Sequence, residues 1–330
     1  MRGLSAALPQ AGIEPVSLRE LGYDPWRFDR RVIWDQVLLP LRARRSGAEL
    51  LHCTSSSMPL LAPLPSVVTI HDVVWLTGSQ AHAPAYARWY FGRFSAERWR
   101  NARAVMVDSA FTRDELLANV SLDPARVTVV HPGVDAEFAA VVRRPSREPL
   151  ILSVGTVERR KNVGIVIEAL AALSEARLIC VGPATPYQTE CERLARRLGV
   201  ADRVTFAGYV TRERLLELYA TATVAVAPSR YEGFGYAAAQ SLCAGVPLVA
   251  ARASSLVEVV QNDAPLLDPD DPSSWSATLA ATLAERDDAE RRAAAVRPGA
   301  IARFSWTAAA RATAAVYREA ISPGRKGVFP

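Results

Sequence analysis

Residues 228–250 of this 330-residue chain read PSRYEGFGYAAAQSLCAGVPLVA, and they indicate a loop and a helix between two strands. The apolar run 223–227 predicts the first strand, and the loop after it holds Glu232 and two glycines. A helix of small residues should then end at Gly245, where the next apolar run begins. Glycines let a backbone approach a ligand closely, and the N–H groups that begin a helix bind anions. This stretch therefore predicts a phosphate-binding loop in a parallel sheet.

Length and composition are those of a globular protein with two ordinary domains. Hydrophobic residues make up 50% of the chain and charged residues 22%, and the net charge of +5 is divided almost evenly between the halves, which does not favour a nucleic-acid binder. The chain has neither an apolar run of roughly 18 residues nor a signal-peptide pattern at its start, so we expect a cytoplasmic protein. Buried, reduced thiols are expected at the cysteines, which lack metal-type spacing: Cys53, Cys180, Cys191 and Cys243.

Strand-like apolar runs alternate with helical patterns along the chain, which is typical of parallel sheets built from β-α-β units. The expected strands are 49–53, 66–71, 104–108 and 127–131 in the first half, and 150–154, 177–181, 204–207, 223–227 and 247–251 in the second. A charged stretch with two prolines, 141–149, separates the halves as a linker would. We predict two doubly wound domains, 1–145 and 146–305, followed by a helix and tail at 306–330. Ligands of such sheets lie beyond the carboxyl ends of the strands.

A second ligand signature opens the second domain. The strand 150–154 leads into Gly155 and then into three consecutive cations, 159–161. A helix should begin near Asn162, a residue type that caps helices well. Only two of the 39 basic residues are lysines, so Lys161 stands out against a strong preference for arginine. A compact ammonium suits a diphosphate, and the alternative is an ordinary solvated loop charge.

The stretch 84–103 combines five arginines with six aromatic residues and a single acidic residue, Glu97. A basic aromatic helix of this kind can lie on an anionic membrane surface. The alternative is a core helix whose arginines surround its buried face. Both interpretations stay open at the level of the sequence.

These features together resemble the retaining glycosyltransferases of family 4, the glycosyl transferases group 1. The resemblance extends from about residue 4 to 320 and rests on motifs at 67–72 (VVTIHD), 129–135 (VVHPGVD), 153–162 and 229–250, with supporting runs at 108–113, 208–210 and 264–269. It implies an α/β GT-B fold, in which two Rossmann-like domains face each other across a cleft. In this fold the last helix packs back toward the first domain.

The resemblance implies a nucleotide-sugar site, mostly in the second domain. Arg160 and Lys161 would neutralise the diphosphate, the helix after Gly235 would donate N–H groups to it, and the loop 208–210 would border the base. The donor-binding residues carried over are Gly155, Arg160, Lys161, Val210, Phe234, Gly235, Tyr236 and Gln240.

Two residues are implied at the reacting carbon of the donor sugar. Glu232 would bind hydroxyls of the sugar and steady the charge at that carbon, and His71, from the first domain, would touch the sugar near the acceptor. The leaving phosphate would itself take the acceptor's proton, so the resemblance implies no protein nucleophile, no metal and no cofactor besides the donor.

The sequence departs from the family pattern at two places. The family usually has a second glutamate eight positions after the first, which binds the ribose diol, and this chain has Gln240 there, which keeps one acceptor and loses the charge. Members of the family begin with a strand and a glycine-rich loop, and neither is recognisable at the start of this sequence. We expect the first β-α unit to be absent.

Other motifs indicate structural roles. We interpret His52 as a strand residue, His82 as a loop residue and His131 as part of an interdomain turn. The acidic pair Asp268 and Asp270 is expected to form a turn and a helix cap rather than a metal site.

The resemblance implies transfer of a hexose from a nucleotide diphosphate sugar to a polysaccharide or glycolipid of the cell envelope. The form of the loop 155–162 resembles users of GDP-mannose, so mannosyl transfer is favoured over UDP-glucose, UDP-N-acetylglucosamine and dTDP-rhamnose. A non-catalytic partner subunit is the alternative function. The expected location is cytoplasmic, with a peripheral contact to the inner face of the membrane through 84–103 as an open alternative.

Overall fold

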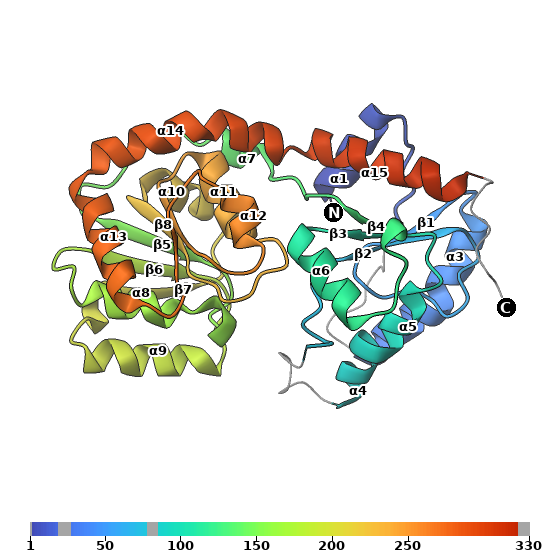
Figure 1. The fold of residues 1–330 in the computed structure, drawn as a ribbon, viewed down its shortest axis with the longest axis horizontal. Helices are drawn as coiled ribbons and strands as arrows, with labels where there is room; N and C mark the ends of the chain where they lie inside the picture. The colour runs from blue at the N-terminus through green and yellow to red at the C-terminus, as the bar shows by residue number, and fades with distance from the viewer. Residues whose placement is uncertain (1, 19–27, 78–84, 323–330) are drawn as a thin grey trace. The chain divides into compact units, whose positions relative to one another are not determined.

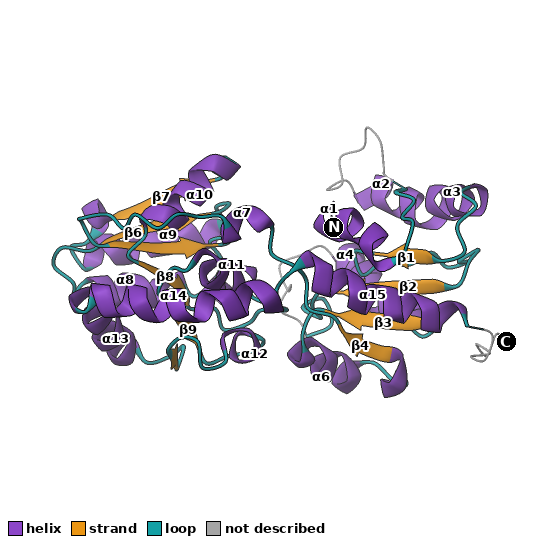
Figure 2. Cartoon of the chain, turned by 90° about the horizontal axis from the view of Figure 1, so that it is seen from above, coloured by secondary structure: helices purple, strands orange, loops and turns teal. Residues whose placement is uncertain are grey.

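A computed structural model describes residues 2–18, 28–77 and 85–322 of the chain. The chain forms two compact units: residues 1–133 together with 306–330, and residues 134–305. The boundary lies earlier than the predicted 145/146, because Val134, Phe138 and Val141 are buried in the core of the second unit. Figure 1 colours the chain from the N-terminus to the C-terminus, and Figure 2 colours it by secondary structure.

The predicted linker 141–149 is part of the second unit. The guanidinium of Arg143 donates to the backbone oxygens of Tyr219, Ala220 and Ala222, and its Nη2 lies 2.5 Å from Oε1 of Glu290. These bonds hold the segment on the surface of the second unit. The segment is therefore fixed to that unit and is not a free linker.

The second unit is built on a six-stranded parallel sheet in the order β10-β9-β8-β5-β6-β7. Five of these strands were predicted, and the short β10 was not. Their bounds are β5 Leu150–Val154, β6 Arg177–Val181, β7 Val204–Gly208, β8 Val224–Ala227, β9 Leu248–Ala251 and β10 Leu266–Leu267. The order reverses direction between β5 and β8, which is the switch point of a doubly wound sheet.

Helices cover both faces of this sheet, as Figure 1 shows. On one face α8 packs against both α9 and α13, and on the other α11 packs against α7, α12 and α14. The helices of the unit are α7 Ala136–Ala139, α8 Val163–Leu170, α9 Pro186–Arg197, α10 Arg212–Thr221, α11 Tyr236–Ala244, α12 Leu256–Val260, α13 Pro272–Ala284 and α14 Arg286–Arg303, with short 3-10 turns η5 Arg159–Lys161 and η6 Ala201–Arg203.

The first unit has a four-stranded parallel sheet in the order β1-β2-β3-β4. Its strands are β1 Leu51–Cys53, β2 Ser66–Ile70, β3 Ala104–Val107 and β4 Val127–Val129, all within the predicted ranges. Side chains alternate between the two faces of the sheet. Val67 and Met106 join one core cluster, while Val68 and Val105 join the other.

One face of this sheet is covered by α1, Arg2–Ala7, by η1, Leu8–Ala11, and by α15, Trp306–Ile321, which contacts β2 and α1. The other core cluster includes residues of α3, α5 and α6. The remaining helical elements are α2 Phe28–Ile33, η2 Trp34–Leu38, α3 Leu39–Arg45, α4 Ala85–Arg88, η3 Trp89–Phe94, α5 Ser95–Trp99, α6 Ala110–Asn119 and η4 Pro124–Arg126. Both faces of the sheet are therefore buried, as in the second unit.

The described part of the basic aromatic stretch, 85–103, combines a buried and an exposed side. Tyr90 and Trp99 are 2% exposed, whereas Tyr86 is 54% and Trp89 is 55% exposed. One side of this helical run therefore belongs to the core, and the other presents aromatic rings to solvent. Among the described helices, none is long and apolar enough to cross a membrane.

Candidate functional site

The loops after β5 and β8 meet at the switch point of the second sheet. They line a hollow of about 10 Å³ together with the start of α11, from residues that include Ser153, Gly155, Ser229, Gly235 and Ala238. This volume holds about one water molecule. The hollow therefore marks where the loops converge, and it is too small to enclose a sugar.

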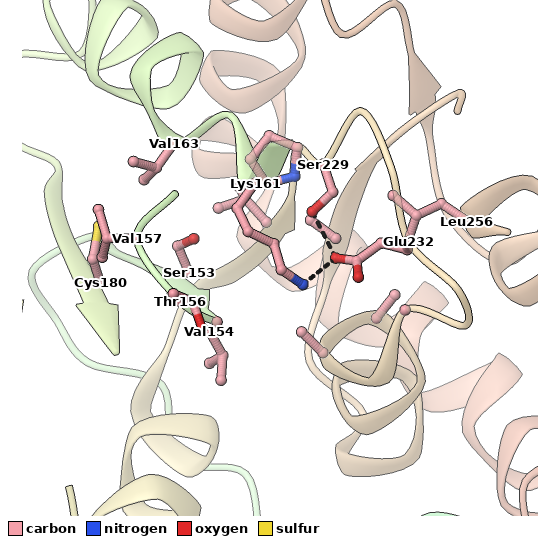
Figure 3. Close-up of a pocket in the computed structure, with 17 residues that line it drawn as sticks. Ser153, Val154, Thr156, Val157, Lys161, Val163, Cys180, Ser229, Glu232 and Leu256 are labelled. Carbon is pink, nitrogen blue, oxygen red and sulfur yellow. Dashed lines mark hydrogen bonds and ion pairs between the residues drawn. The ribbon is translucent and has the colours of Figure 1, made fainter. Parts of the chain in front are cut away.

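An ion pair joins the two predicted loops at this point. The Nζ of Lys161 lies 2.5 Å from Oε1 of Glu232, and the hydroxyl of Ser229 donates to the same oxygen at 2.7 Å (Figure 3). The Lys161 side chain is 20% exposed and that of Glu232 is 11% exposed. The alternative of an ordinary solvated loop charge at Lys161 is therefore wrong, because its ammonium is mostly buried and paired.

The backbone of Glu232 is held from both sides. Its N–H donates to Oγ of Ser254 at 2.9 Å, and its carbonyl accepts from the hydroxyl of Ser255 at 2.9 Å. These two serines come just after β9 and start the turn into α12. The carboxylate is therefore fixed in direction before any ligand arrives, as preorganised electrostatic stabilisation requires.

Arg160 provides a second cation beside the same carboxylate. Its Nη1 donates to the carbonyl of Tyr231 at 3.0 Å and lies 3.5 Å from Oε2 of Glu232. Its Nη2 lies 2.8 Å from Oε1 of Glu158. The structure thus brings Arg160, Lys161 and Glu232 together, from loops about 70 residues apart in the sequence.

Two of the predicted glycines are required by the packing of these loops. Gly235 has φ +89°, and a Cβ there would lie 2.7 Å from Cδ2 of Leu256. Gly155 has φ +144°, and a Cβ there would lie 3.5 Å from Cε of Lys161. A side chain at either position would strain the backbone, and at Gly235 it would also collide with Leu256.

Asn162 precedes α8 as predicted, but it does not cap the helix with its side chain. Its backbone is left-handed, with φ 55°. Its Nδ2 instead donates to the carbonyl of Pro269 at 2.8 Å. The left-handed conformation turns the amide away from the first N–H groups of the helix and ties the loop to the segment before α13.

The other predicted donor residues lie around α11 and β7. Phe234 is buried against Tyr236, at a ring distance of 5.2 Å, and Tyr236 is 42% exposed. Oε1 of Gln240 accepts from the hydroxyl of the buried Tyr219 at 3.1 Å. Val210 packs against the core after β7 and is not among the residues that line the hollow.

His71 lies in the first unit, directly after β2. Its Nδ1 is 2.7 Å from Oδ2 of Asp108, and its Nε2 is 2.9 Å from the carbonyl of Thr54. The side chain is 45% exposed, whereas that of Asp108 is 8% exposed. Burial lowers the pKa of His71, but the hydrogen bond and the charge of Asp108 outweigh burial and raise it above its usual value.

The remaining candidate residues lie at positions where their contacts are with the rest of the fold. His52 lies on β1, with Nδ1 2.6 Å from the hydroxyl of Tyr317 and Nε2 2.7 Å from Oγ1 of Thr69. Asp271 caps α13 by accepting from the N–H groups of Ser273 and Ser274, and the predicted residue His82 lies outside the described ranges. The cysteines at 53, 180, 191 and 243 are free and buried. Within residues 2–18, 28–77 and 85–322 there is no group of three or more metal-ligating side chains.

Sequence reasoning missed several residues that hold the site. Ser229 and Asp108 stand inside motifs that were recognised, but nothing in their spacing showed which atoms they would contact. Ser254 and Tyr219 gave no signal, because their partners come from distant segments, whereas Glu158 stands only two residues before its partner Arg160. A polar residue directly after a buried strand, as Asp108 is after β3, was the one usable indication.

Two family models match adjoining parts of the chain. The model described as Glycosyltransferase Family 4 matches residues 3–138, and the model described as glycosyl transferases group 1 matches residues 134–297. Together they span most of the chain, in the order that the sequence motifs predicted.

Curated relatives of the chain are named as glycosyltransferases and mannosyltransferases. A D-inositol 3-phosphate glycosyltransferase of Xylanimonas cellulosilytica is 37% identical over 235 residues, which cover 64% of this chain and 56% of that protein. An MMP alpha-(1->4)-mannosyltransferase of Mycolicibacterium hassiacum is 29% identical over 283 residues, covering 84% of this chain and 69% of the relative. The chain spans about half the length of the inositol-phosphate relatives that it matches.

Solved structures share the fold. A sucrose-phosphate synthase from Thermosynechococcus elongatus superposes with a TM-score of 0.76 at 21% identity, covering 96% of this chain and 91% of that chain. HepE of Anabaena, in complex with UDP and glucose, superposes with a TM-score of 0.70 at 18% identity, covering 87% and 83%. With the family models and the curated relatives, these likenesses confirm the resemblance, and the chain belongs to glycosyltransferase family 4, with two Rossmann-like domains of the GT-B fold.

Proposed function

We propose that this chain is a retaining glycosyltransferase that moves a hexose from a nucleotide diphosphate sugar to an acceptor hydroxyl. One observation carries the proposal: two cations, Arg160 and Lys161, converge with the buried carboxylate of Glu232 at the switch point of the second sheet. A diphosphate needs fixed positive charge, and a sugar carbon that gains positive charge needs a fixed negative group nearby. The arrangement supplies both from preorganised loops.

In the proposed reaction the acceptor oxygen attacks the anomeric carbon on the face from which the diphosphate departs. The bond between that carbon and the phosphate oxygen breaks, the bond to the acceptor oxygen forms, and the acceptor proton passes to a phosphate oxygen of the leaving group. Lys161 and Arg160 stabilise the charge that gathers on the diphosphate, while Glu232 stabilises the sugar carbon. The donor is the only cofactor-like molecule in this scheme.

GDP-mannose is the donor we favour. The loop Gly-Thr-x-Glu-x-Arg-Lys-Asn at 155–162 has the form that resembles mannosyltransferases, and the relative from Mycolicibacterium hassiacum is named for mannosyl transfer. We propose a lipid-linked or polysaccharide acceptor. Because many relatives are named D-inositol 3-phosphate glycosyltransferases, that polyol phosphate is the first soluble acceptor to test.

The donor is tested by thermal shift with UDP, GDP and dTDP. A ligand at 100 times its dissociation constant adds about 2.7 kcal/mol of stability, so the true nucleotide should stand out from the other two. Stabilisation by GDP alone is expected, and stabilisation by UDP or dTDP alone would contradict the choice of GDP-mannose. No shift with any of the three would contradict the nucleotide-sugar site.

Transfer is tested with Lys161 variants and the acceptors above. Lys161→Ala should lower the rate at least about a hundredfold, because a preorganised charge on the leaving group contributes roughly 3 kcal/mol to the transition state. Lys161→Arg should recover only part, since a planar guanidinium places its charge elsewhere. Arg159→Ala is the matched control, because Arg159 is 71% exposed and pairs with Glu190 away from Glu232. Full activity of Lys161→Ala would rule out the loop as the diphosphate site.

A non-catalytic partner subunit is the second candidate function, and Gln240 is the observation that favours it. Its Oε1 already accepts from Tyr219, and its amide offers no charge to a ribose diol. Nucleotide binding with no transfer to any acceptor would support this alternative. Measurable transfer by the wild-type chain would exclude it.

We also propose a peripheral membrane contact through the described part of the basic aromatic stretch. Tyr86 and Trp89 expose more than half of their side chains, and Arg93 is 83% exposed on the same run of helix. The protein should sediment with anionic vesicles at low salt and be released by salt, because surface charge is screened within about 10 Å at 0.1 M. Arg88→Ser/Arg93→Ser should weaken sedimentation, whereas Arg98 packs over Phe94 and is left unchanged. Unchanged sedimentation of the variant would assign the helix to the core alone.

A further inference from the structure

His71 meets an acceptor at each of its ring nitrogens. Nε2 lies 2.9 Å from the carbonyl oxygen of Thr54, and Nδ1 lies 2.7 Å from a carboxylate oxygen of Asp108. A carbonyl oxygen can only accept a hydrogen bond, so Nε2 must carry a proton. The protonation of the ring is then decided at Nδ1.

The proton between Nδ1 and Asp108 rests on the imidazole. A free imidazole has a pKa of about 6.5 and a free aspartic acid one of about 3.9, so the ring is the stronger base by more than two units. With protons on both nitrogens, His71 is an imidazolium paired with the Asp108 carboxylate. Charge-assisted bonds of this kind are shorter and stronger than neutral ones, in keeping with the 2.7 Å separation.

The groups around His71 favour the same state. Asp108 follows β3 and precedes α6, with 8% of its side chain exposed, and Asp72 is the next residue along the chain. His52 on β1 is the other titratable group that interacts with the ring, and burial followed by the charge of His71 lowers the pKa of His52 to about 4. His71 therefore has two carboxylates beside it, and its histidine neighbour is neutral at neutral pH.

We infer that Asp108 is a positioning residue that keeps His71 doubly protonated, so that His71 serves the reaction as a fixed cation and hydrogen-bond donor and not as a general base. The inference rests on the proposed function, since the reaction in question is the proposed glycosyl transfer. An imidazolium has no lone pair with which to take a proton from an acceptor hydroxyl. His71 can therefore only donate: the N–H that is bonded to the carbonyl of Thr54 can instead donate to an oxygen of the substrate.

This role specifies the chemistry of the substrate atom that His71 meets. The atom must be an acceptor, such as a sugar hydroxyl oxygen or a phosphate oxygen, and an anionic oxygen would bind best. The side chain is 45% exposed, so its charge is open to such a group without a rearrangement of the core. The proton of the attacking hydroxyl is then left to the departing phosphate.

The protonation state is tested directly by NMR titration of the histidine rings. The chain has only four histidines, and His71→Gln assigns the resonance of interest. In the wild-type protein we expect a midpoint above 6.5, and Asp108→Asn should lower it, because the charge is lost while an acceptor oxygen remains. Asp72→Asn is the matched control: Asp72 acts on His71 through its charge, whereas Asp108 acts through both a hydrogen bond and its charge, so the shift should be smaller.

A wild-type midpoint at or below 6.5, or an equal midpoint in the wild type and Asp108→Asn, would overturn the inference. If Asp108→Asn does not fold, Asp108→Glu replaces it: this variant keeps the charge, so its midpoint should stay above 6.5, and a midpoint below that value would also overturn the inference. These readouts need no substrate, so they stand even if the proposed transfer reaction is wrong.

The pH profile of transfer distinguishes the positioning role from a merely structural one. The rate should fall as pH rises through the midpoint of His71, because the cation is lost, and Asp108→Asn should move this fall to lower pH by the same number of units as the NMR midpoint. A uniform loss of rate with an unchanged profile would show that Asp108 only supports the fold. A rate that instead rises through the His71 midpoint would identify His71 as a base.

Discussion

Removal of the Lys161 ammonium should destabilise the second unit even without a ligand. Breaking a fully buried ion pair costs 3–5 kcal/mol, because it leaves one charge unpaired. Here the two side chains are 20% and 11% exposed, and the Glu232 carboxylate keeps the Ser229 hydroxyl at 2.7 Å and Arg160 at 3.5 Å. We therefore expect a loss of about 2 kcal/mol for Lys161→Ala.

Calorimetry measures this loss in the unit that holds the pair, since two units can melt in separate transitions. The second unit runs from 134 to 305, and for a domain of this size 1 kcal/mol shifts the melting temperature by roughly 2–4 °C. Lys161→Ala should then lower its transition by about 4–8 °C. Arg159→Ala, two residues away in the same 3-10 turn and 71% exposed, should cost less than about 1 kcal/mol.

The expected cause of the lost stability is the Glu232 carboxylate, which loses its ammonium partner, and a double variant tests this cause. Glu232→Gln in the Lys161→Ala background should restore part of the lost stability, because the uncompensated charge is removed. Equal losses for Lys161→Ala and Arg159→Ala, or a further loss on adding Glu232→Gln, would refute the reasoning. The pair would then be a contact of no energetic consequence.

Three further predictions follow from single residues. If Gln240 still reaches the ribose, Gln240→Glu should tighten nucleotide binding several-fold and Gln240→Ala should weaken it, and equal affinities by calorimetric titration would show that the position no longer reads the ribose. Gly235→Ala should weaken nucleotide binding and lower the melting temperature, because alanine is strained at φ +89° and its Cβ would lie 2.7 Å from Leu256; unchanged binding would mean that the start of α11 can shift freely. Burial lowers the pKa of His52 to about 4 in the folded chain, whereas in the unfolded chain the ring takes up a proton near pH 6.5. The free energy of unfolding should therefore fall by roughly 3 kcal/mol at most as the pH drops from 6.5 toward 4. His52→Gln should remove most of this fall, and denaturant titrations at pH 7 and 5 that show equal acid sensitivity in both proteins would contradict the assignment.

The alternation of apolar runs and helical patterns determined both sheets, because parallel strands buried on two faces leave a local pattern in the sequence. All nine expected strands are present, and of the strands in the described residues only the two-residue β10 was missed. Lys161 and Glu232 were also recognisable as candidate site residues, since they stand in the segments that follow β5 and β8. Local signals of this kind survive folding because they depend on neighbours along the chain.

Contacts between distant segments were decided only by the tertiary structure. The segment 141–149 has the composition of a linker, yet Arg143 ties it to the second unit through carbonyls of 219–222. Asn162 has the side chain of a helix cap, yet its left-handed backbone sends the amide to Pro269. The position of Asp108 in the sequence did not indicate that it would pair with His71, because His71 follows a different strand. The sequence by itself determined which residues end each strand, while the order of the strands in the sheet decided which of those residues meet.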